Sequence, residues 1–316
     1  MEEPRSIPVE AVTQAPASPP RYLPVREEFA YRFLSGEGLE IGALHMPLPV
    51  PPQARVSQVD RMPVEELRRH YPEMAALPLQ PVDVVDDGET LATIAPESQD
   101  FIVANHFLEH TADPIGTIET HLGKLRPGGV LFYAVPDKRF SFDFRRPVTP
   151  LEHMVRDHEQ GPEGSRRQHY EEWARFVAST DEERAAEGFE ELVAERAREL
   201  DAADYSIHTH VWTQASFLGL LLLCRERFEE AFDIEAVAQC SLELVVVLRK
   251  RGAWPQPAEP DASIAELRRE MARLERHGDR AQSELVAATK ELRAVEASPS
   301  WRLTRPLRWL KSRLGR

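Results

Sequence analysis

The chain has 316 residues, 42% of them hydrophobic, and a formal net charge of −14, so one domain of about 230 residues can bury a full core and leave residues for appendages. The acidic balance disfavours nucleic acid as a partner of the main domain. The chain has two cysteines without C-x-x-C spacing, which excludes a thiolate zinc site. No apolar run approaches the ~18 residues of a membrane span, and the acidic N-terminus is not typical of a signal peptide.

Residues 1–24 are proline-bearing and polar, and we expect a disordered tail there, followed by one domain over residues 25–252. In that domain a short helix from Glu27 to Phe33 leads into an apolar strand that breaks at Gly42, and the next strand ends at Asp60. In open α/β sheets such a glycine lets the backbone approach a ligand, and an acid at the end of the next strand accepts sugar hydroxyls. The pair predicts a nucleoside-binding site.

The turn after the first strand indicates which nucleoside is bound. A dinucleotide site needs G-x-G-x-x-G, whereas Gly42 is followed by Ala43, Leu44, His45, Met46 and Pro47. The preceding acid, Glu40, would repel a phosphate and attract an ammonium group. S-adenosylmethionine carries an ammonium group and no phosphate, so the turn favours this cofactor.

Five segments in order resemble the motifs of class I S-adenosylmethionine-dependent methyltransferases: Glu40-Ile-Gly42, Asp60, residues 82–88, residues 100–110 and residues 125–135. The resemblance implies an α/β fold with a mostly parallel, seven-stranded Rossmann-like sheet that ends in an antiparallel hairpin. The family's first turn usually reads E-x-G-x-G-x-G, and we place Ala43 and His45 at its second and third glycine positions. This departure leaves open a degenerate domain that acts as a non-catalytic scaffold.

The residues themselves support this architecture. Strand and helix patterns alternate through the fifth strand, which is typical of a parallel sheet with crossover helices. Residues 228–238 and 242–250 are two β-like runs separated by three residues, so they form an antiparallel hairpin. Between them and the fifth strand, residues 137–212 form a long insertion before a helix at 213–224, and such insertions usually carry substrate contacts.

The resemblance also assigns site residues. It implies cofactor contacts at the turns after the first four strands, from Glu40, Gly42, Ala43, Asp60, Asp86, Asp87, Gly88, Asn105 and His106. Deprotonating a sugar hydroxyl benefits from a general base, for which histidine is the commonest choice near neutral pH. We therefore take as catalytic candidates His106, His110 and His208, although His110 could equally have a structural role.

The insertion carries the candidate acceptor-binding residues, which are polar or aromatic: His158, Arg166, His169, Tyr170, His210 and Trp212. Paired histidines beside an acid could hold a divalent metal instead. No spacing among them is diagnostic of a metal site, so we predict a polar acceptor pocket and no metal.

Three C-terminal segments follow: a linker at 253–262, a coiled coil at 263–297 with five consecutive a/d pairs, and a basic tail at 298–316. The heptads predict a homo-oligomer, or alternatively one amphipathic helix folded back on the domain. The tail carries six positive charges and no acid, with Trp301 and Trp309 among its apolar residues, so it could lie on an anionic membrane surface or pack on the acidic body. Its S-W-R-x-T-x-P-L-R pattern resembles the C-terminal ends of bacterial enzymes that build cell-surface polysaccharides.

The sequence thus predicts a bacterial, cytoplasmic methyltransferase, with possible peripheral contact at the inner face of the membrane. We expect it to use S-adenosylmethionine to methylate an oxygen of a saccharide in cell-envelope polysaccharide synthesis. The alternatives are a non-catalytic scaffold and a methyltransferase acting on a small metabolite or a lipid.

Overall fold

The structure is a computed structural model, and it describes residues 23–252 apart from residues 72, 73, 75 and 241, together with the single residues 269, 273 and 276. The predicted linker, coiled coil and basic tail, and the N-terminal tail up to residue 22, lie outside the described residues except for those three single positions.

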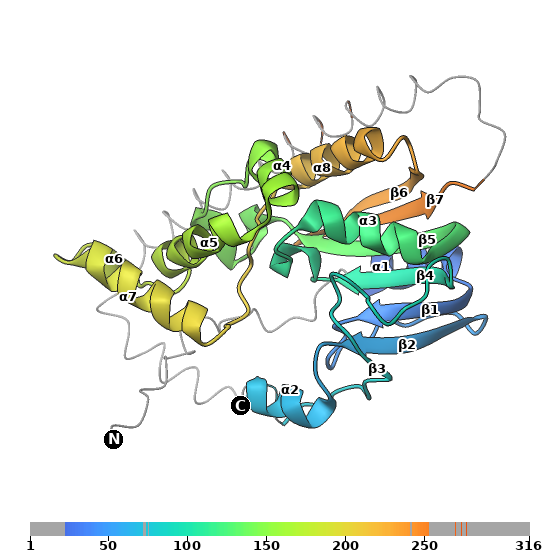
Figure 1. The fold of residues 1–316 in the computed structure, drawn as a ribbon, viewed down its shortest axis with the longest axis horizontal. Helices are drawn as coiled ribbons and strands as arrows, with labels where there is room; N and C mark the ends of the chain where they lie inside the picture. Colours follow the sequence, from blue (N-terminus) through green and yellow to red (C-terminus); the bar gives the residue numbers. More distant parts are fainter. Residues whose placement is uncertain are drawn as a thin grey trace, which may run out of the picture. The chain divides into compact units, whose positions relative to one another are not determined.

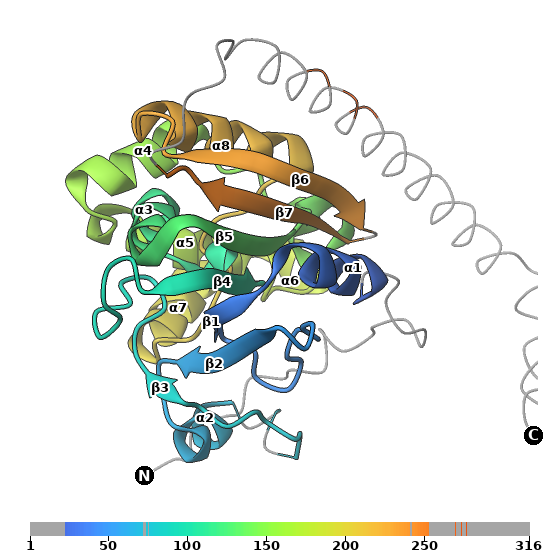
Figure 2. The ribbon, with the colours of Figure 1, turned by 90° about the vertical axis from the view of Figure 1, so that its right-hand side faces the viewer.

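The described domain is built on one seven-stranded sheet with the order β3-β2-β1-β4-β5-β7-β6. Its strands are β1 (Gly36–Ile41), β2 (Ala54–Asp60), β3 (Val84–Val85), β4 (Gln99–Asn105), β5 (Leu125–Pro136), β6 (Phe232–Cys240) and β7 (Glu243–Lys250). The first five run parallel, whereas β7 is antiparallel to both of its neighbours. Figure 2 shows the strands stacked in this order, which confirms the predicted fold class and its terminal hairpin.

The central strands are apolar because both of their faces are covered. On one face, Phe101, Val103 and Phe132 pack with Ala30 and Leu34, at and just beyond the end of helix α1 (Leu23–Phe33). On the other face lies α3 (Pro114–Lys124), where the ring of His121 hydrogen-bonds the Tyr133 hydroxyl of β5 at 2.8 Å. Helix α8 (Gln214–Arg227) packs beside β6, and a capping box between Thr213 and Ser216 starts it. The result is a helix–sheet–helix sandwich (Figures 1 and 2).

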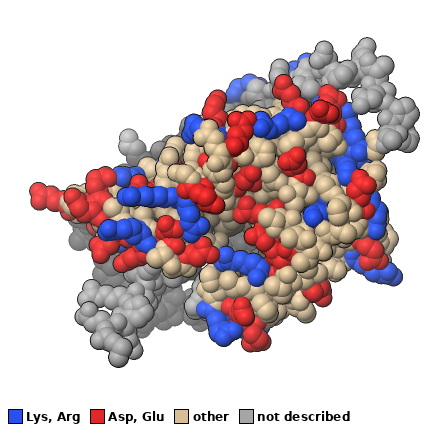
Figure 3. Space-filling view, in the orientation of Figure 1, with Lys and Arg blue, Asp and Glu red and all other residues tan. Residues whose placement is uncertain are grey.

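The insertion forms its own helical layer beyond the carboxyl ends of the parallel strands (Figure 1). It contains the short 3-10 turns η4 (Lys138–Phe140) and η5 (Phe142–Arg145), and the helices α4 (Leu151–Gln160), α5 (Glu163–Phe176), α6 (Asp181–Arg184) and α7 (Phe189–Ala202). Tyr170, Trp173 and Leu200 belong to a small apolar core that joins α5 to α7. Acidic side chains gather at the far end of this layer, over α6 and α7 (Figure 3).

Two further elements follow strands at the same carboxyl edge of the sheet: α2 (Val64–His70) after β2, and the 3-10 turn η3 (Leu108–His110) after β4. None of the described helices is long and apolar enough to cross a membrane.

Candidate active site

A cavity of about 370 Å³ opens at the carboxyl ends of β1, β2, β3 and β4. Its walls bring together the turns after these four strands, which are far apart in the chain. The lining includes Gly42, Asp60, Asp87, Gly88 and His106 of the predicted cofactor site, and apolar side chains from Ile41, Leu44, Met74 and Phe107. This is the place where open α/β sheets bind their ligands.

The turn after β1 exposes bare backbone to this cavity. Gly42 has a φ of +66°, and a Cβ added there would meet no atom within 4 Å. Counting from Glu40, the later glycine positions of E-x-G-x-G-x-G fall on Leu44 and Met46, not on Ala43 and His45 as we had placed them. Leu44 has a φ of +50°, a left-handed conformation that usually takes glycine. The chain therefore keeps a conformation typical of the glycine-rich turn without the glycine.

Four predicted cofactor residues, Glu40, Ala43, Asp86 and Asn105, do not line the cavity. The buried carboxylate of Glu40 accepts hydrogen bonds from the Leu48 backbone at 2.8 Å and from the Gln58 amide at 3.0 Å, and it is not among the lining residues. Burial raises the pKa of Glu40, although these two hydrogen bonds and the charge of Arg26 oppose the rise. The structure thus gives Glu40 the role of fixing the turn after β1.

Asp86 and Ala43 also accept hydrogen bonds from the backbone of the turns in which they lie. Asp86 accepts hydrogen bonds from Asp87, Ala92 and Thr93 and shapes the loop after β3, while the carbonyl of Ala43 accepts from the amide of Met46 at 2.8 Å. The side-chain amide of Asn105 has no hydrogen-bond partner among the described residues and does not line the cavity.

His106 belongs to a network of charges between the cavity and α1. Its Nε2 lies 2.8 Å from Glu243 of β7, and its Nδ1 lies 3.3 Å from Glu109. Glu243 is fully buried and also accepts from Arg26 of α1. Burial alone would lower the pKa of His106, but the hydrogen bonds and charges of Glu109 and Glu243 outweigh it and raise this pKa to about 9. His106 is therefore a cation at neutral pH, which suits a carboxylate ligand and not the role of a general base.

His110 is the predicted base that remains neutral. Burial, and the charge of the neighbouring His208, lower the pKa of His110 to about 4. Its Nδ1 lies 2.9 Å from the Ile207 carbonyl, which can only accept, so Nε2 is the nitrogen with a free lone pair. His208 packs edge-on against His110 at 4.7 Å between ring centroids, and its Nδ1 lies 2.6 Å from Asp143. His208 thus lies behind His110 and does not line the cavity.

A second cavity, of about 190 Å³, adjoins the first on the side of the insertion. Arg61, Glu89 and His110 line both, as do Tyr205 and Ser206. The predicted acceptor residues Arg166, His169 and Tyr170 line the second cavity, where Arg166 pairs with Asp201 at 2.7 Å and Asp204 at 3.1 Å. A bound acceptor here would lie directly beside a ligand of the first cavity.

The other predicted acceptor residues are placed elsewhere. His158 pairs with Asp113 at 2.9 Å, and His210 and Trp212 are buried, Trp212 packing on Phe217. Three acids beside the site, Glu89, Glu109 and Glu243, were not predicted from the sequence. Glu243 could have been noticed, because it is the one acid near the start of an apolar strand, whereas nothing in the sequence near Glu89 or Glu109 indicates that the fold buries them beside the site.

Residues 25–214, three fifths of the chain, match the family described as "Methyltransferase domain". The chain belongs to this family. The match and the strand order confirm the class predicted from the five motifs, so the protein is an S-adenosylmethionine-dependent methyltransferase. No curated protein matches the sequence of this methyltransferase.

Several solved structures resemble the methyltransferase at low sequence identity. A SAM-dependent methyltransferase from Aquifex aeolicus is 14% identical, with 72% of this chain and 88% of that chain covered and a TM-score of 0.38. A putative methyltransferase (BH2331) from Bacillus halodurans C-125 is 12% identical, with 73% and 99% covered and a TM-score of 0.40. The N-methyltransferase NodS from Bradyrhizobium japonicum WM9, in complex with S-adenosyl-L-homocysteine, is 15% identical, with 70% and 80% covered and a TM-score of 0.35.

The residues of the first cavity fit S-adenosylmethionine. The open backbone at Gly42 leaves room for a close approach, and the carboxylate of Asp60 can accept from ribose hydroxyls. The cationic His106 matches the carboxylate of the methionine part, and Ile41, Leu44 and Phe107 offer an apolar wall to the adenine. A pyrophosphate would find no such match, since Asp60, Asp87 and Glu89 line the same space.

Proposed function

We propose that the protein methylates a hydroxyl oxygen of a saccharide, in the synthesis of bacterial cell-envelope polysaccharide. The observation that carries this proposal is the second cavity, which adjoins the cofactor cavity and shares the neutral imidazole of His110 with it.

The lining of the second cavity favours a polar acceptor. Arg166, Asp204 and Ser206 offer hydrogen-bonding groups, and Tyr170 and Tyr205 add aromatic surface. A saccharide carries many hydroxyls that can exchange hydrogen bonds with such groups, whereas a lipid chain would take these polar groups out of water and add no hydrogen bond. The lining therefore supports a saccharide, or a small polar metabolite, over a lipid.

When bound, S-adenosylmethionine supplies an electrophilic methyl group, and the protein has to align the acceptor and remove its proton. His110 is the residue that lines both cavities with a free nitrogen lone pair. When Nε2 takes the acceptor proton, the buried carboxylate of Glu109 stabilises the resulting imidazolium, because its charge raises the pKa of His110. The Asp143–His208 pair holds the ring from behind.

The direct test uses polysaccharide isolated from a deletion strain of the source bacterium. Purified protein with methyl-labelled S-adenosylmethionine should transfer label to this polysaccharide, and the label should survive mild base, because a sugar ether is stable where an ester is cleaved. The variant His110→Asn serves as the control, with folding checked by circular dichroism. No transfer to the polysaccharide, combined with transfer to a small polar metabolite from the same extract, would replace the saccharide by that metabolite.

The proposal extends to the site of action and to the C-terminal segments. We propose that residues 263–297 associate the chain with further copies of itself and that the basic residues 298–316 contact the anionic inner face of the membrane, where envelope polysaccharide is assembled. The charge and heptad pattern of the sequence supports both ideas.

A further inference from the structure

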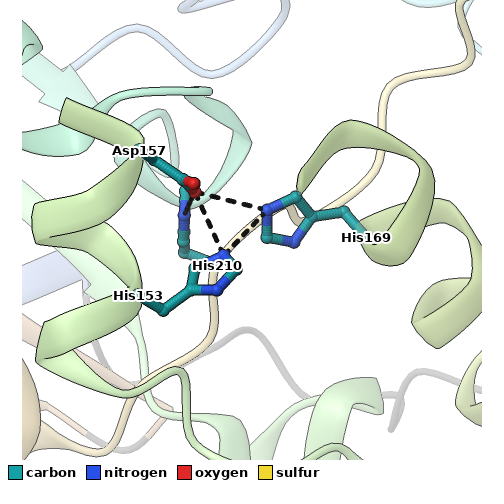
Figure 4. A group of neighbouring side chains, drawn as sticks. All are labelled: His153, Asp157, His169 and His210. Carbon is teal, nitrogen blue, oxygen red and sulfur yellow. Dashed lines mark hydrogen bonds and ion pairs between the residues drawn. The ribbon is translucent and has the colours of Figure 1, made fainter. Parts of the chain in front are cut away.

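The insertion contains a second cluster of chemistry-bearing side chains, apart from the cofactor cavity. His153 and Asp157 lie one turn apart on α4, His169 lies on α5, and His210 lies in the segment before α8. None of the four is more than 7% exposed. Figure 4 shows their side chains converging on one point from these three parts of the chain.

The four polar atoms lie close together. Asp157 Oδ2 lies 3.0 Å from His153 Nε2, 3.6 Å from His210 Nε2 and 3.7 Å from His169 Nε2, and the Nε2 atoms of His153 and His169 are 3.2 Å apart. All four atoms lie within 4.8 Å of one another. Zinc bound tetrahedrally at ~2.0–2.1 Å separates its ligand atoms by about 3.3–3.4 Å. The observed separations bracket this value.

Hydrogen bonds alone do not satisfy the cluster. Nδ1 of His210 lies 3.1 Å from the Thr111 carbonyl, so Nδ1 carries the hydrogen and Nε2 presents a lone pair to Asp157. A proton on Nε2 would have to reach Asp157 over 3.6 Å, which is too long for a hydrogen bond. Both His210 Nε2 and Asp157 Oδ2 are buried and have no hydrogen-bond partner among the described residues. A bound cation would satisfy both lone pairs, whereas a proton on His153 Nε2, 3.0 Å from Asp157 Oδ2, would leave His210 Nε2 without a donor.

Metal-binding histidines usually donate their second ring nitrogen to a carbonyl or a carboxylate, and His210 donates Nδ1–H to the Thr111 carbonyl in this way. This hydrogen bond leaves Nε2 free to bind a metal. Metal binding by His153 would require the side chain of Arg156 to move. Metal binding at its Nε2 requires the hydrogen on Nδ1, so the exposed side chain of Arg156, now 3.3 Å from Nδ1, has to turn into solvent.

We propose that His153, Asp157, His169 and His210 bind one zinc ion in a closed, structural site. Imidazole and carboxylate ligands suit zinc, and four protein ligands leave no open position for catalysis. The ion joins α4, α5 and the segment before α8. Because α5 carries Arg166, His169 and Tyr170, the ion also fixes one wall of the acceptor cavity. No metal was predicted from the sequence, because the four ligands span 58 residues without a diagnostic spacing.

The first test is the metal content of the full-length protein, measured by mass spectrometry after dialysis against limiting zinc. We expect about one zinc per chain in the wild type and in His158→Ala, a matched control on the same helix whose ring pairs with Asp113 instead. Asp157→Asn and His169→Gln should bind zinc at least about tenfold more weakly, because even the loss of an outer support costs 10–100-fold. Cobalt in place of zinc should give the visible absorption of a tetrahedral site in the wild type and not in Asp157→Asn.

A second measurement avoids variants that fail to fold. Treating the wild type with a strong chelator should lower its unfolding temperature, and added zinc should restore it. The proposal is wrong if the wild type binds no stoichiometric zinc or if Asp157→Asn and His169→Gln keep the wild-type content. It is also wrong if zinc is lost in His208→Asn and retained in Asp157→Asn, because the ion would then belong to the neighbouring group Glu109, His110 and His208.

Discussion

Replacing Glu243 by alanine should destabilise the protein strongly, although this residue lies on the last strand of the sheet. Glu243 is fully buried and accepts from Arg26 Nε at 2.7 Å and from His106 Nε2 at 2.8 Å. Removing one partner of a buried ion pair costs about 3–5 kcal/mol, because the other charge stays buried. For a domain of this size each kcal/mol lowers the unfolding temperature by about 2–4 °C. We therefore expect a decrease of about 6–20 °C.

Differential scanning calorimetry of the wild type and two variants measures this effect. The control is Glu37→Ala, which removes the pair between Glu37 and Arg55, whose side chains are 59% and 81% exposed. Such exposed pairs contribute about 0–1 kcal/mol, so this control should lower the unfolding temperature by less than about 4 °C. Equal decreases in Glu243→Ala and Glu37→Ala would refute the reasoning from burial.

The same network fixes how stability depends on pH. The pKa of His106 rises from its usual 6.5 to about 9 in the folded protein, through Glu109 and Glu243 against the effect of burial. The folded state therefore binds a proton that the unfolded state releases, and stability falls as pH rises between these values. The contribution is complete below pH 6.5 and lost above about pH 9. An NMR titration of the histidines should show this pKa, and Glu243→Gln should move it down.

Three further predictions concern the cofactor, the base and the C-terminal segments. Asp60→Ala should weaken S-adenosylmethionine binding by about 1.5–3 kcal/mol in titration calorimetry, which is the range for hydrogen bonds to a charged group. The control is Asp83→Ala, which should bind the cofactor normally because the Asp83 carboxylate accepts from the Gln58 backbone. Equal affinities of the two variants would remove Asp60 from the site. His110→Asn and His208→Asn should lower kcat and spare cofactor binding, and His106→Asn should also weaken the cofactor; full turnover in all three would exclude a histidine base. Deleting 298–316 should abolish binding to anionic vesicles and keep the oligomer, and deleting 263–316 should give a monomer that still binds cofactor. A full-length monomer that ignores such vesicles at low salt would contradict both assignments.

The fold was predictable because its signals are local. The parallel strands β4 and β5 are largely apolar, and the first, second and fourth strands are followed by or end in a glycine, an acid or a histidine. The link between the last two strands is so short that they can pair only antiparallel. The residues at the strand ends, Gly42, Asp60 and His106, were predictable for the same reason. Parallel strands all end at one edge, so residues at their carboxyl ends meet there.

Side-chain direction and charge were not predictable. The sequence places Glu40 at the end of a strand, but only the fold shows that its carboxylate turns to Leu48 and Gln58. Likewise, the protonation of His106 depends on Glu243, which lies 137 residues away in the chain. The grouping of His153, His169 and His210 depends on the packing of two helices and a loop, which no spacing in the sequence encodes.

Titration calorimetry of S-adenosylmethionine into the full-length protein tests most directly whether the cavity at Gly42, Asp60 and His106 is a cofactor site. Saturable binding of one equivalent is expected in the wild type, with an affinity that falls above about pH 9 as His106 loses its proton. A folded wild-type protein that takes up no S-adenosylmethionine at millimolar concentration would contradict the assignment of this cavity and the mechanism built on it.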